Sequence, residues 1–272
     1  MALLVNSIIM LGMLVLMPLG LRLVDGPGIA RLARWWPVVA VPSAVALWLP
    51  RGALAAGLCV PYALMTLLLL AGLAVTRLAQ RRSLASAEVA VLTALAAPTA
   101  AASALVAERA GHELFGFGLG ILALTVPHLH FAGFGAALIA GLVCRSVDSG
   151  AARAAAWCVP VGTLLVLAGY FVDDTAELAG AVVLTTGMWL IAWLTWRDVR
   201  ARSADRATRT LLAVAAATLA VTMLLALSWA LGEATGLPHP SLAWMAATHG
   251  LANALAFVLC ALVAWRRTGV RA

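Results

Sequence analysis

The stretch "LLAVAAATLAVTMLLALSWAL", residues 211–231, decides the fold class because it contains no charged side chain. About 20 apolar residues in a row form a helix long enough to cross the hydrocarbon core of a bilayer. A membrane span must also satisfy its own backbone hydrogen bonds, as a helix does. The run is longer and more uniform than a barrel strand of roughly ten residues with alternating polarity. It therefore predicts a transmembrane helix.

The composition extends this interpretation to the whole chain. Of 272 residues, 64% are hydrophobic and 11% are charged, and the mean hydropathy is +1.03. Soluble domains are about 45–50% apolar and about 25% charged. No polar stretch is long enough to fold as a separate soluble domain. We therefore expect residues 1–272 to form a single transmembrane domain.

The apolar runs predict an all-α fold, a polytopic transmembrane helical bundle of about nine helices, with eight as the alternative. The predicted ranges are 2–24, 35–49, 53–76, 84–107, 113–144, 152–172, 177–196, 209–232 and 241–265. Pro50 ends the short second range. Pro127 lies inside the fifth range, where it predicts a kink.

The arginines predict the orientation of the chain. The net charge is +7, and 16 of the 18 basic residues fall in every second loop, whereas Arg51 and Arg109 fall in the loops between. Positive charge marks the cytoplasmic side of a membrane protein. We therefore expect the N-terminus outside and the C-terminus in the cytoplasm, and the alternation favours nine helices over eight. Because this topology accounts for the positive charge, no nucleic-acid partner is expected.

The acidic residues follow the opposite distribution. Six of them fall at the outer ends of the predicted helices or in outer loops: Glu108, Glu113, Asp173, Asp174, Glu177 and Glu233. We therefore expect any acid chemistry to belong to the outer half of the membrane domain.

Two segments place ionisable rings inside apolar spans. "VPHLHFAGFGAAL", residues 126–138, carries His128 and His130. An ionisable side chain in lipid is costly unless it faces a partner or a wet cavity, so each is a functional candidate. Because the two histidines are two residues apart, they point to nearly opposite sides of a regular helix. Both face one site only if Pro127 distorts the turn.

The second segment is "WMAATHGLANALAF", residues 244–257. His249 and Asn253 are four residues apart and share one helix face. We expect the two histidine segments to meet near the middle of the bilayer in a shared polar pocket. The alternative is that these side chains only provide hydrogen bonds between helices, which is a common use of histidine and asparagine in membranes.

The pairing of "HLHFAGF" (His128 to Phe134) with "THGLANALAF" (Thr248 to Phe257) resembles the YndJ-like family of bacterial membrane proteins. The two segments comprise 17 of the 272 residues. The resemblance implies a multi-pass protein of the bacterial cell (inner) membrane. It also implies a transporter, because the family is generally described as transporters of unknown substrate.

"DDTAE", Asp173 to Glu177, has two interpretations. It has the form of the acidic box that holds magnesium and diphosphate in soluble terpene synthases. Asp174 and Glu177 also have the spacing of a capping box that opens the seventh helix. No basic residues accompany the segment to bind a diphosphate, which favours the capping interpretation.

The leading functional hypothesis is an intramembrane enzyme that isomerises or cyclises a lipophilic prenyl or terpenoid substrate by proton transfer, without a cofactor. A protonated acid donates to an alkene or epoxide, a second polar residue removes a proton, and aromatic rings shelter the cation. The expected catalytic residues are Glu113, His128, His130, Asp174, His249 and Asn253. The expected substrate-binding residues are Phe131, Phe134, Trp229 and Trp244.

Two other hypotheses stay open. A transporter for a small molecule or lipid is what the family resemblance implies, although the sequence contains no inverted repeat or matched pair of interrupted helices. A metal enzyme would use His128, His130 and His249 as ligands. The two-residue spacing of the first two histidines argues against their binding one ion on a regular helix. In every case the expected partners are the lipid bilayer and a hydrophobic small molecule.

Overall fold

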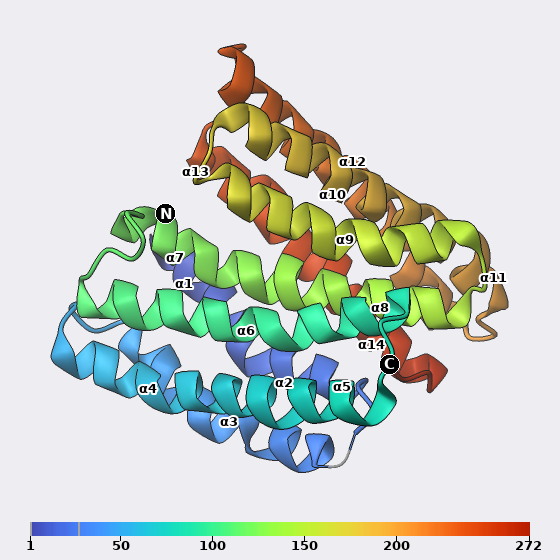
Figure 1. The fold of residues 1–272 in the computed structure, drawn as a ribbon, viewed down its shortest axis with the longest axis horizontal. Coiled ribbons are helices and arrows are strands. Elements are labelled where there is room, and N and C mark those ends of the chain that lie inside the picture. Colours follow the sequence, from blue (N-terminus) through green and yellow to red (C-terminus); the bar gives the residue numbers. More distant parts are fainter. Residues whose placement is uncertain (1, 27) are drawn as a thin grey trace. The chain divides into compact units, whose positions relative to one another are not determined.

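The computed structural model describes residues 2–26 and 28–272, and its regular elements are helices. The predicted all-α fold is confirmed. Nine continuous helices run through the described residues, and several contain π-helical segments, labelled η (Figure 1).

The first four helices are α1 (Ala2–Leu11) with η1 (Gly12–Leu16) and α2 (Met17–Leu21); α3 (Ile29–Ala46); α4 (Ala53–Leu68) with η2 (Leu69–Ala74) and α5 (Val75–Arg81); and α6 (Ser86–Ala110). The fifth to seventh are α7 (Leu119–His128) with η3 (Leu129–Ala136) and α8 (Ala137–Ser146); α9 (Gly150–Gly169); and α10 (Asp174–Leu194) with η4 (Thr195–Val199) and α11 (Arg200–Arg202). The last two are α12 (Arg206–Thr235), and α13 (Leu242–Met245) with η5 (Ala246–Gly250), η6 (Asn253–Leu259) and α14 (Cys260–Thr268).

Eight of these helices are long and apolar enough to cross a membrane, which makes the chain a multi-pass membrane protein. The exception is α3. The sequence predicts a helix from residue 35, but α3 begins at Ile29 and so includes Arg31 and Arg34. These two charges lower the hydropathy of a helix that has only 18 residues.

The fifth helix begins later than predicted. The expected start is residue 113, but α7 begins at Leu119. A tight turn precedes it, in which Phe117 N donates to Leu114 O (3.0 Å) and Gly116 has φ of +83°. A glycine tolerates this left-handed conformation at little cost, which explains why the helix cannot extend back through the turn.

Both histidine segments contain π-helical turns. His130 lies in η3, which begins two residues after Pro127, whereas His249 lies in η5 and Asn253 in η6. π-Helical turns are rare and occur frequently at functional sites. The kink at Pro127 stays a prediction.

The contacts group the chain into two compact units. The first consists of Met1–Ser83 and Leu92–Gly135, and the second of Leu84–Val91 and Ala136–Ala272. The prediction of a single domain is not tested by this grouping.

In the second unit, glycines allow α9 and α10 to run next to each other at close range (Figure 1). A Cβ atom on Gly162 would lie 2.5 Å from Leu184 N, and one on Gly180 would lie 2.5 Å from Val166 N. Gly169 and Gly187 have similarly close neighbours on the opposite helix. Small residues at such positions let the backbones of membrane helices approach and gain packing contacts.

Candidate functional site

His130 forms a buried pair with a tyrosine in the first unit. Tyr62, on α4, and His130 are both 0% exposed, and the tyrosine hydroxyl forms a hydrogen bond with His130 Nε2. His130 Nδ1 lies 2.7 Å from the carbonyl oxygen of Val126. A carbonyl oxygen only accepts, so Nδ1 carries the hydrogen and Nε2 accepts from the tyrosine.

Trp36, on α3, extends this buried group. Its ring lies edge-on to Tyr62 with centroids 5.6 Å apart, and its indole Nε1 donates to Met13 O (3.1 Å). The Tyr62 and His130 rings are stacked with centroids 5.8 Å apart. A Cβ on Gly12 would lie 3.1 Å from His130 Cβ, so a glycine at this position lets η1 approach the histidine. We call Trp36, Tyr62 and His130 the Trp–Tyr–His group.

His128 does not share the environment of His130. Its side chain is exposed, whereas that of His130 is fully buried. On a regular helix, side chains two residues apart point to nearly opposite sides, which accounts for this difference. That both histidines face one pocket stays a prediction.

His249 and Asn253 form a second group, in the second unit. His249 Nδ1 lies 2.8 Å from Thr222 O on α12, and the Asn253 amide Nδ2 lies 3.3 Å from His249 Nε2. The Thr222 hydroxyl donates to Asn253 Oδ1 (2.9 Å). The predicted common face of His249 and Asn253 is confirmed. We call these three residues the Thr–Asn–His group.

The hydrogen bonds of the Thr–Asn–His group fix the tautomer of His249. Because Nδ1 faces a carbonyl oxygen, it carries the hydrogen, and Nε2 is left as the basic nitrogen. A base held in one orientation by a second group is the arrangement that general acid–base catalysis uses. His249 and Asn253 are half-buried, so this group, unlike the Trp–Tyr–His group, is accessible at its edge.

The two acids predicted to be catalytic are exposed, whereas a third acid, close in sequence to one of them, is buried. Glu113 and Asp174 are exposed, whereas Glu177 is 8% exposed. Asp173, rather than the predicted Asp174, caps α10, because its carboxylate accepts from Ala176 N (2.7 Å). An aspartate therefore caps this helix as predicted, but the capping residue lies one position earlier in the sequence. The helix α10 also begins three residues earlier than expected.

Glu177 belongs to a group of polar side chains at one end of α10 and α12. Burial, together with the nearby charges of Glu177 and Glu233, raises the pKa of Tyr170 to about 12. Glu233 also lies 3.2 Å from His239 Nε2. Sequence reasoning placed Glu177 and Glu233 among the outer acids but did not single out Glu177 as the buried one.

The expected aromatic residues have different degrees of exposure. Phe131 is 5% and Phe134 0% exposed, and both lie in η3 with His130. Trp229 is half-buried on α12, and Trp244 is 47% exposed on α13. Trp229 is seven residues after Thr222 and therefore lies on the same face of α12.

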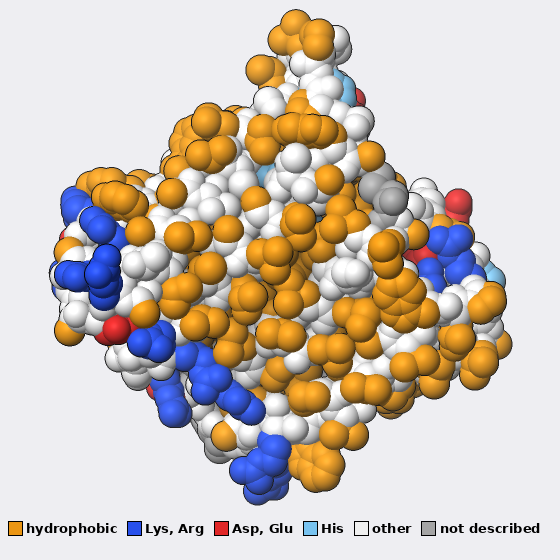
Figure 2. All heavy atoms as spheres, turned by 180° about the vertical axis from the view of Figure 1, so that it is seen from behind, with side chains coloured by type: hydrophobic (Ala, Val, Ile, Leu, Met, Phe, Trp, Pro, Cys, Tyr) orange, Lys and Arg blue, Asp and Glu red, His pale blue; other side chains and the backbone are white. Residues whose placement is uncertain are grey.

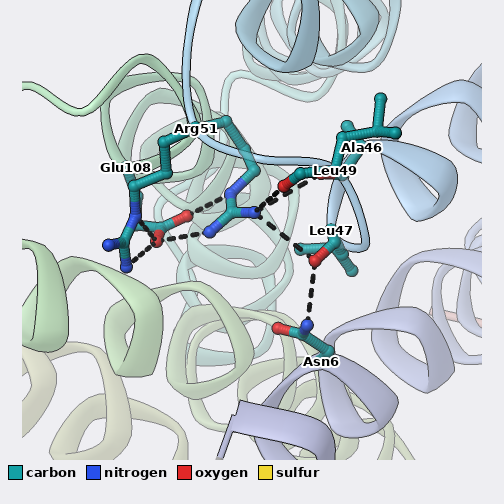
Figure 3. A network of polar contacts seen from close by, with 7 residues as sticks. Asn6, Ala46, Leu47, Leu49, Arg51 and Glu108 are labelled. Atoms are coloured by element: carbon teal, nitrogen blue, oxygen red, sulfur yellow. Dashed lines mark hydrogen bonds and ion pairs between the residues drawn. The ribbon is translucent and has the colours of Figure 1, made fainter.

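A further polar network in the first unit joins the end of α3, the loop between α3 and α4, and the end of α6, and it extends to Asn6 on α1 (Figure 3). Glu108 Oε1 accepts from Arg51 Nε (2.9 Å) and Arg109 Nη2 (2.6 Å). Arg109 Nη1 donates to three carbonyl oxygens at and just after the end of α3, each at 3.4 Å: Ala46, Leu47 and Leu49. The sequence contained one signal for this network, since its two arginines are those that break the alternation of charge.

The structure places the two histidine groups in different units, so the shared pocket stays a prediction. Each group also contains a hydroxyl partner, Tyr62 or Thr222, that sequence reasoning missed. Among the described residues, no three His, Cys, Asp or Glu side chains form a set that could hold a metal ion.

Comparison with known families adds one decisive observation. The family model described as YndJ-like protein matches residues 7–257, which include both histidine segments. The chain belongs to the YndJ-like family. The resemblance inferred from "HLHFAGF" and "THGLANALAF" in this YndJ-like protein is therefore confirmed. No curated protein and no solved structure matched the chain.

Proposed function

We propose that this YndJ-like protein is an intramembrane acid–base enzyme that isomerises or cyclises a lipophilic prenyl or terpenoid substrate, with or without an epoxide. The observation that carries the proposal is the Thr–Asn–His group, in which His249 is held in one tautomer inside an apolar span. We further propose that the protein lies in the bacterial inner membrane with its C-terminus in the cytoplasm.

His249 acts as the general base in this proposal. The contact between Asn253 Nδ2 and His249 Nε2, at 3.3 Å, is the longest in the group. A substrate that replaces this contact presents a C–H bond to Nε2, and the Asn253 amide is then available to donate a hydrogen bond to a substrate oxygen. Thr222 is a positioning residue, because its hydroxyl and carbonyl hold both partners.

An acid completes the reaction by donating one proton to an alkene carbon or an epoxide oxygen. Asp174 and Glu177 lie in the first turn of α10, and Glu177 is the one shielded from water. One proton enters the substrate and one leaves it, so substrate and product have the same mass. Trp229 and Trp244 would stabilise the intermediate cation through their ring faces.

A conversion assay tests the proposal. The full chain in lipid nanodiscs would receive prenyl lipids with and without an epoxide, and the products would be separated by liquid chromatography and mass spectrometry. We expect a product of unchanged mass, and His249→Gln should reduce its rate by about a hundredfold or more, because general-base catalysis supplies at least that factor.

Thr248→Ala is the matched control. Thr248 is next to His249 but its hydroxyl donates to Trp244 O of its own helix (2.8 Å), so this variant should keep the activity. Equal rates in His249→Gln and the wild type would refute the assigned base. A wild type that converts no member of the panel would leave the enzyme proposal without support.

A transporter is the second candidate function, and one observation favours it. The histidine of each group, His130 or His249, lies in a π-helical interruption, one in each compact unit. Interrupted helices in two halves of a membrane protein often mark a transport site. Proteoliposomes loaded with the same prenyl lipids would separate the candidates, because a transporter moves its substrate across the bilayer without changing its structure.

A further inference from the structure

In the second unit, the arginines outnumber the acidic residues that lie near them. The described ion pairs show which of these arginines are neutralised. Each of four acids pairs with one arginine: Glu88 with Arg145, Asp148 with Arg153, Asp198 with Arg197, and Asp205 with Arg267. No acidic partner is described for five other arginines: Arg200, Arg202, Arg206, Arg209 and Arg266. In Figure 2 the arginines are gathered in groups beside a surface covered mainly by hydrophobic side chains.

Arg200 differs from these other arginines because it is held in place without the use of its terminal nitrogens, whereas Arg202 donates from Nη1 to Ser146 O (2.8 Å). Its guanidinium carbon lies 4.2 Å from the centre of the Trp196 ring, and its Nε donates to Trp196 O (3.2 Å). The two terminal nitrogens have no described partner, so they are oriented but unused. A guanidinium held in this way can bind a phosphate through two parallel hydrogen bonds with little further loss of side-chain freedom.

Exposed tryptophans continue from this arginine along the same helix. Trp193 is 46% and Trp196 47% exposed, although both side chains are large and apolar. Arg197 stacks over Trp193, with its guanidinium carbon 3.9 Å from the ring centre. Tryptophan prefers the boundary between the hydrocarbon core and the lipid headgroups. The helix therefore places an aromatic surface at headgroup depth and an unneutralised guanidinium next to it.

We propose that Trp193, Trp196 and Arg200 form a binding site for an anionic phospholipid. Arg200 binds the phosphodiester through its terminal nitrogens, and the two indole rings contact the glycerol and upper acyl-chain region. A zwitterionic lipid binds less well because its own ammonium group competes for the phosphate, and the local excess of arginines favours a net negative charge. This proposal does not depend on the reaction proposed above.

Native mass spectrometry of the full chain in detergent tests the site, with phosphatidylglycerol and phosphatidylcholine added at equal concentration. We expect a preference for phosphatidylglycerol, and Arg200→Gln should reduce its apparent affinity by about fivefold, the effect of one basic residue near a membrane surface. Trp196→Ala keeps all charges but removes the ring that holds Arg200, and should also weaken binding of this lipid.

Arg153→Gln is the matched control, because Arg153 is an exposed arginine that pairs with Asp148 and stacks on no described tryptophan. It should leave the affinity within about twofold of the wild type. Equal losses in Arg153→Gln and Arg200→Gln would overturn the proposal in favour of a diffuse charge effect. Equal binding of the two lipids, or displacement of the lipid by inorganic phosphate, would also overturn it.

Discussion

Arg109 shows how one buried charge can hold several chain segments together. Its guanidinium contacts the Glu108 carboxylate and the carbonyl oxygens that follow α3, where the last turn of a helix leaves acceptors without intrahelical donors. Glu108 and Arg109 side chains are 3% and 9% exposed. The Arg109 charge is therefore compensated by Glu108 and these carbonyls, and the Glu108 charge by Arg109 and Arg51.

The Arg109→Gln substitution should therefore be strongly destabilising. Removing one partner of a buried pair leaves an uncompensated charge, which costs about 3–5 kcal/mol. The melting temperature of the detergent-solubilised protein, followed by tryptophan fluorescence, would measure the loss. Arg51→Gln is the matched control, because Arg51 bonds the same carboxylate but is 49% exposed. It should cost about 0–1 kcal/mol, and equal decreases for the two variants would contradict the account.

The residues of the two histidine groups could be predicted only in part. His130, His249 and Asn253 stand out because ionisable and amide side chains are rare in spans. Thr222 does not stand out, because a threonine in a membrane helix usually bonds a carbonyl of its own helix. Thr125 and Thr163 do so in this protein. Only tertiary packing distinguishes Thr222, whose hydroxyl reaches Asn253.

Among the helices, the pairing of α9 and α10 depends most directly on small residues. Gly180→Ala should destabilise the second unit by about 1–3 kcal/mol, because overpacking forces a backbone shift. Its new Cβ would lie 2.5 Å from Val166 N, a backbone atom that cannot rotate away. Thermal unfolding in detergent measures the effect.

Gly57→Ala is the matched control on α4, since a Cβ at Gly57 meets nothing within 4 Å. It should be neutral or stabilise by up to about 1 kcal/mol through helix propensity. A Gly180→Ala variant as stable as Gly57→Ala would show that the close approach of α9 and α10 is wrong.

The start of α12 is fixed to the end of α14 by a cluster around Asp205. The Thr208 hydroxyl (2.7 Å) and then the Arg267 guanidinium (2.6 Å) hold the pKa of Asp205 well below its ordinary value. A carboxyl with a lowered pKa in the folded state stabilises the fold above its ordinary pKa, and this stabilisation is lost as the pH falls toward the folded-state value.

Asp205→Asn should therefore lower the melting temperature by a similar small amount from about pH 8 to about pH 5, because Asp205 stays ionised throughout that window. Asp148→Asn is the control, since Asp148 is 99% exposed, and should leave the melting temperature unchanged. A deficit for Asp205→Asn that disappears by the acid end of this window would be inconsistent with the lowered pKa.

Helix boundaries could be predicted from the sequence where the composition changes abruptly. They could not be predicted where the backbone conformation determines the residue at which a helix begins. The predicted ends of most spans lie within a few residues of the observed ones. The start at Leu119 could not be predicted from apolar content, because Phe115 and Gly116 are in a left-handed turn that hydropathy does not detect. The π-helical turns could not be predicted either, because hydrogen bonds between residues i and i+5 leave no signature in the spacing of apolar residues.

At the scale of the whole molecule, the role of α3 decides the topology. If α3 crosses the membrane with the eight long apolar helices, the termini lie on opposite sides; if it does not, they lie on the same side. The distribution of arginines predicts nine crossings, with the C-terminus in the cytoplasm.

Cysteines introduced at Ala2 and Ala272 in a cysteine-free background would test this topology in intact cells. A membrane-impermeant maleimide should label position 2 and leave position 272 unlabelled until the cells are opened. Labelling of both positions, or of neither, in intact cells would support eight crossings instead.

The central claim is that this YndJ-like protein exchanges protons with a lipophilic substrate, and conversion in heavy water tests it most directly. A proton donated by an acidic side chain equilibrates with solvent, so the product formed in D₂O should carry one deuterium on carbon or oxygen, with the carbon-bound label surviving return to H₂O. We predict this carbon-bound label for the alkene substrates with the wild type and Thr248→Ala, and its loss with His249→Gln. A product without deuterium, or the same labelled product in His249→Gln, would contradict the account.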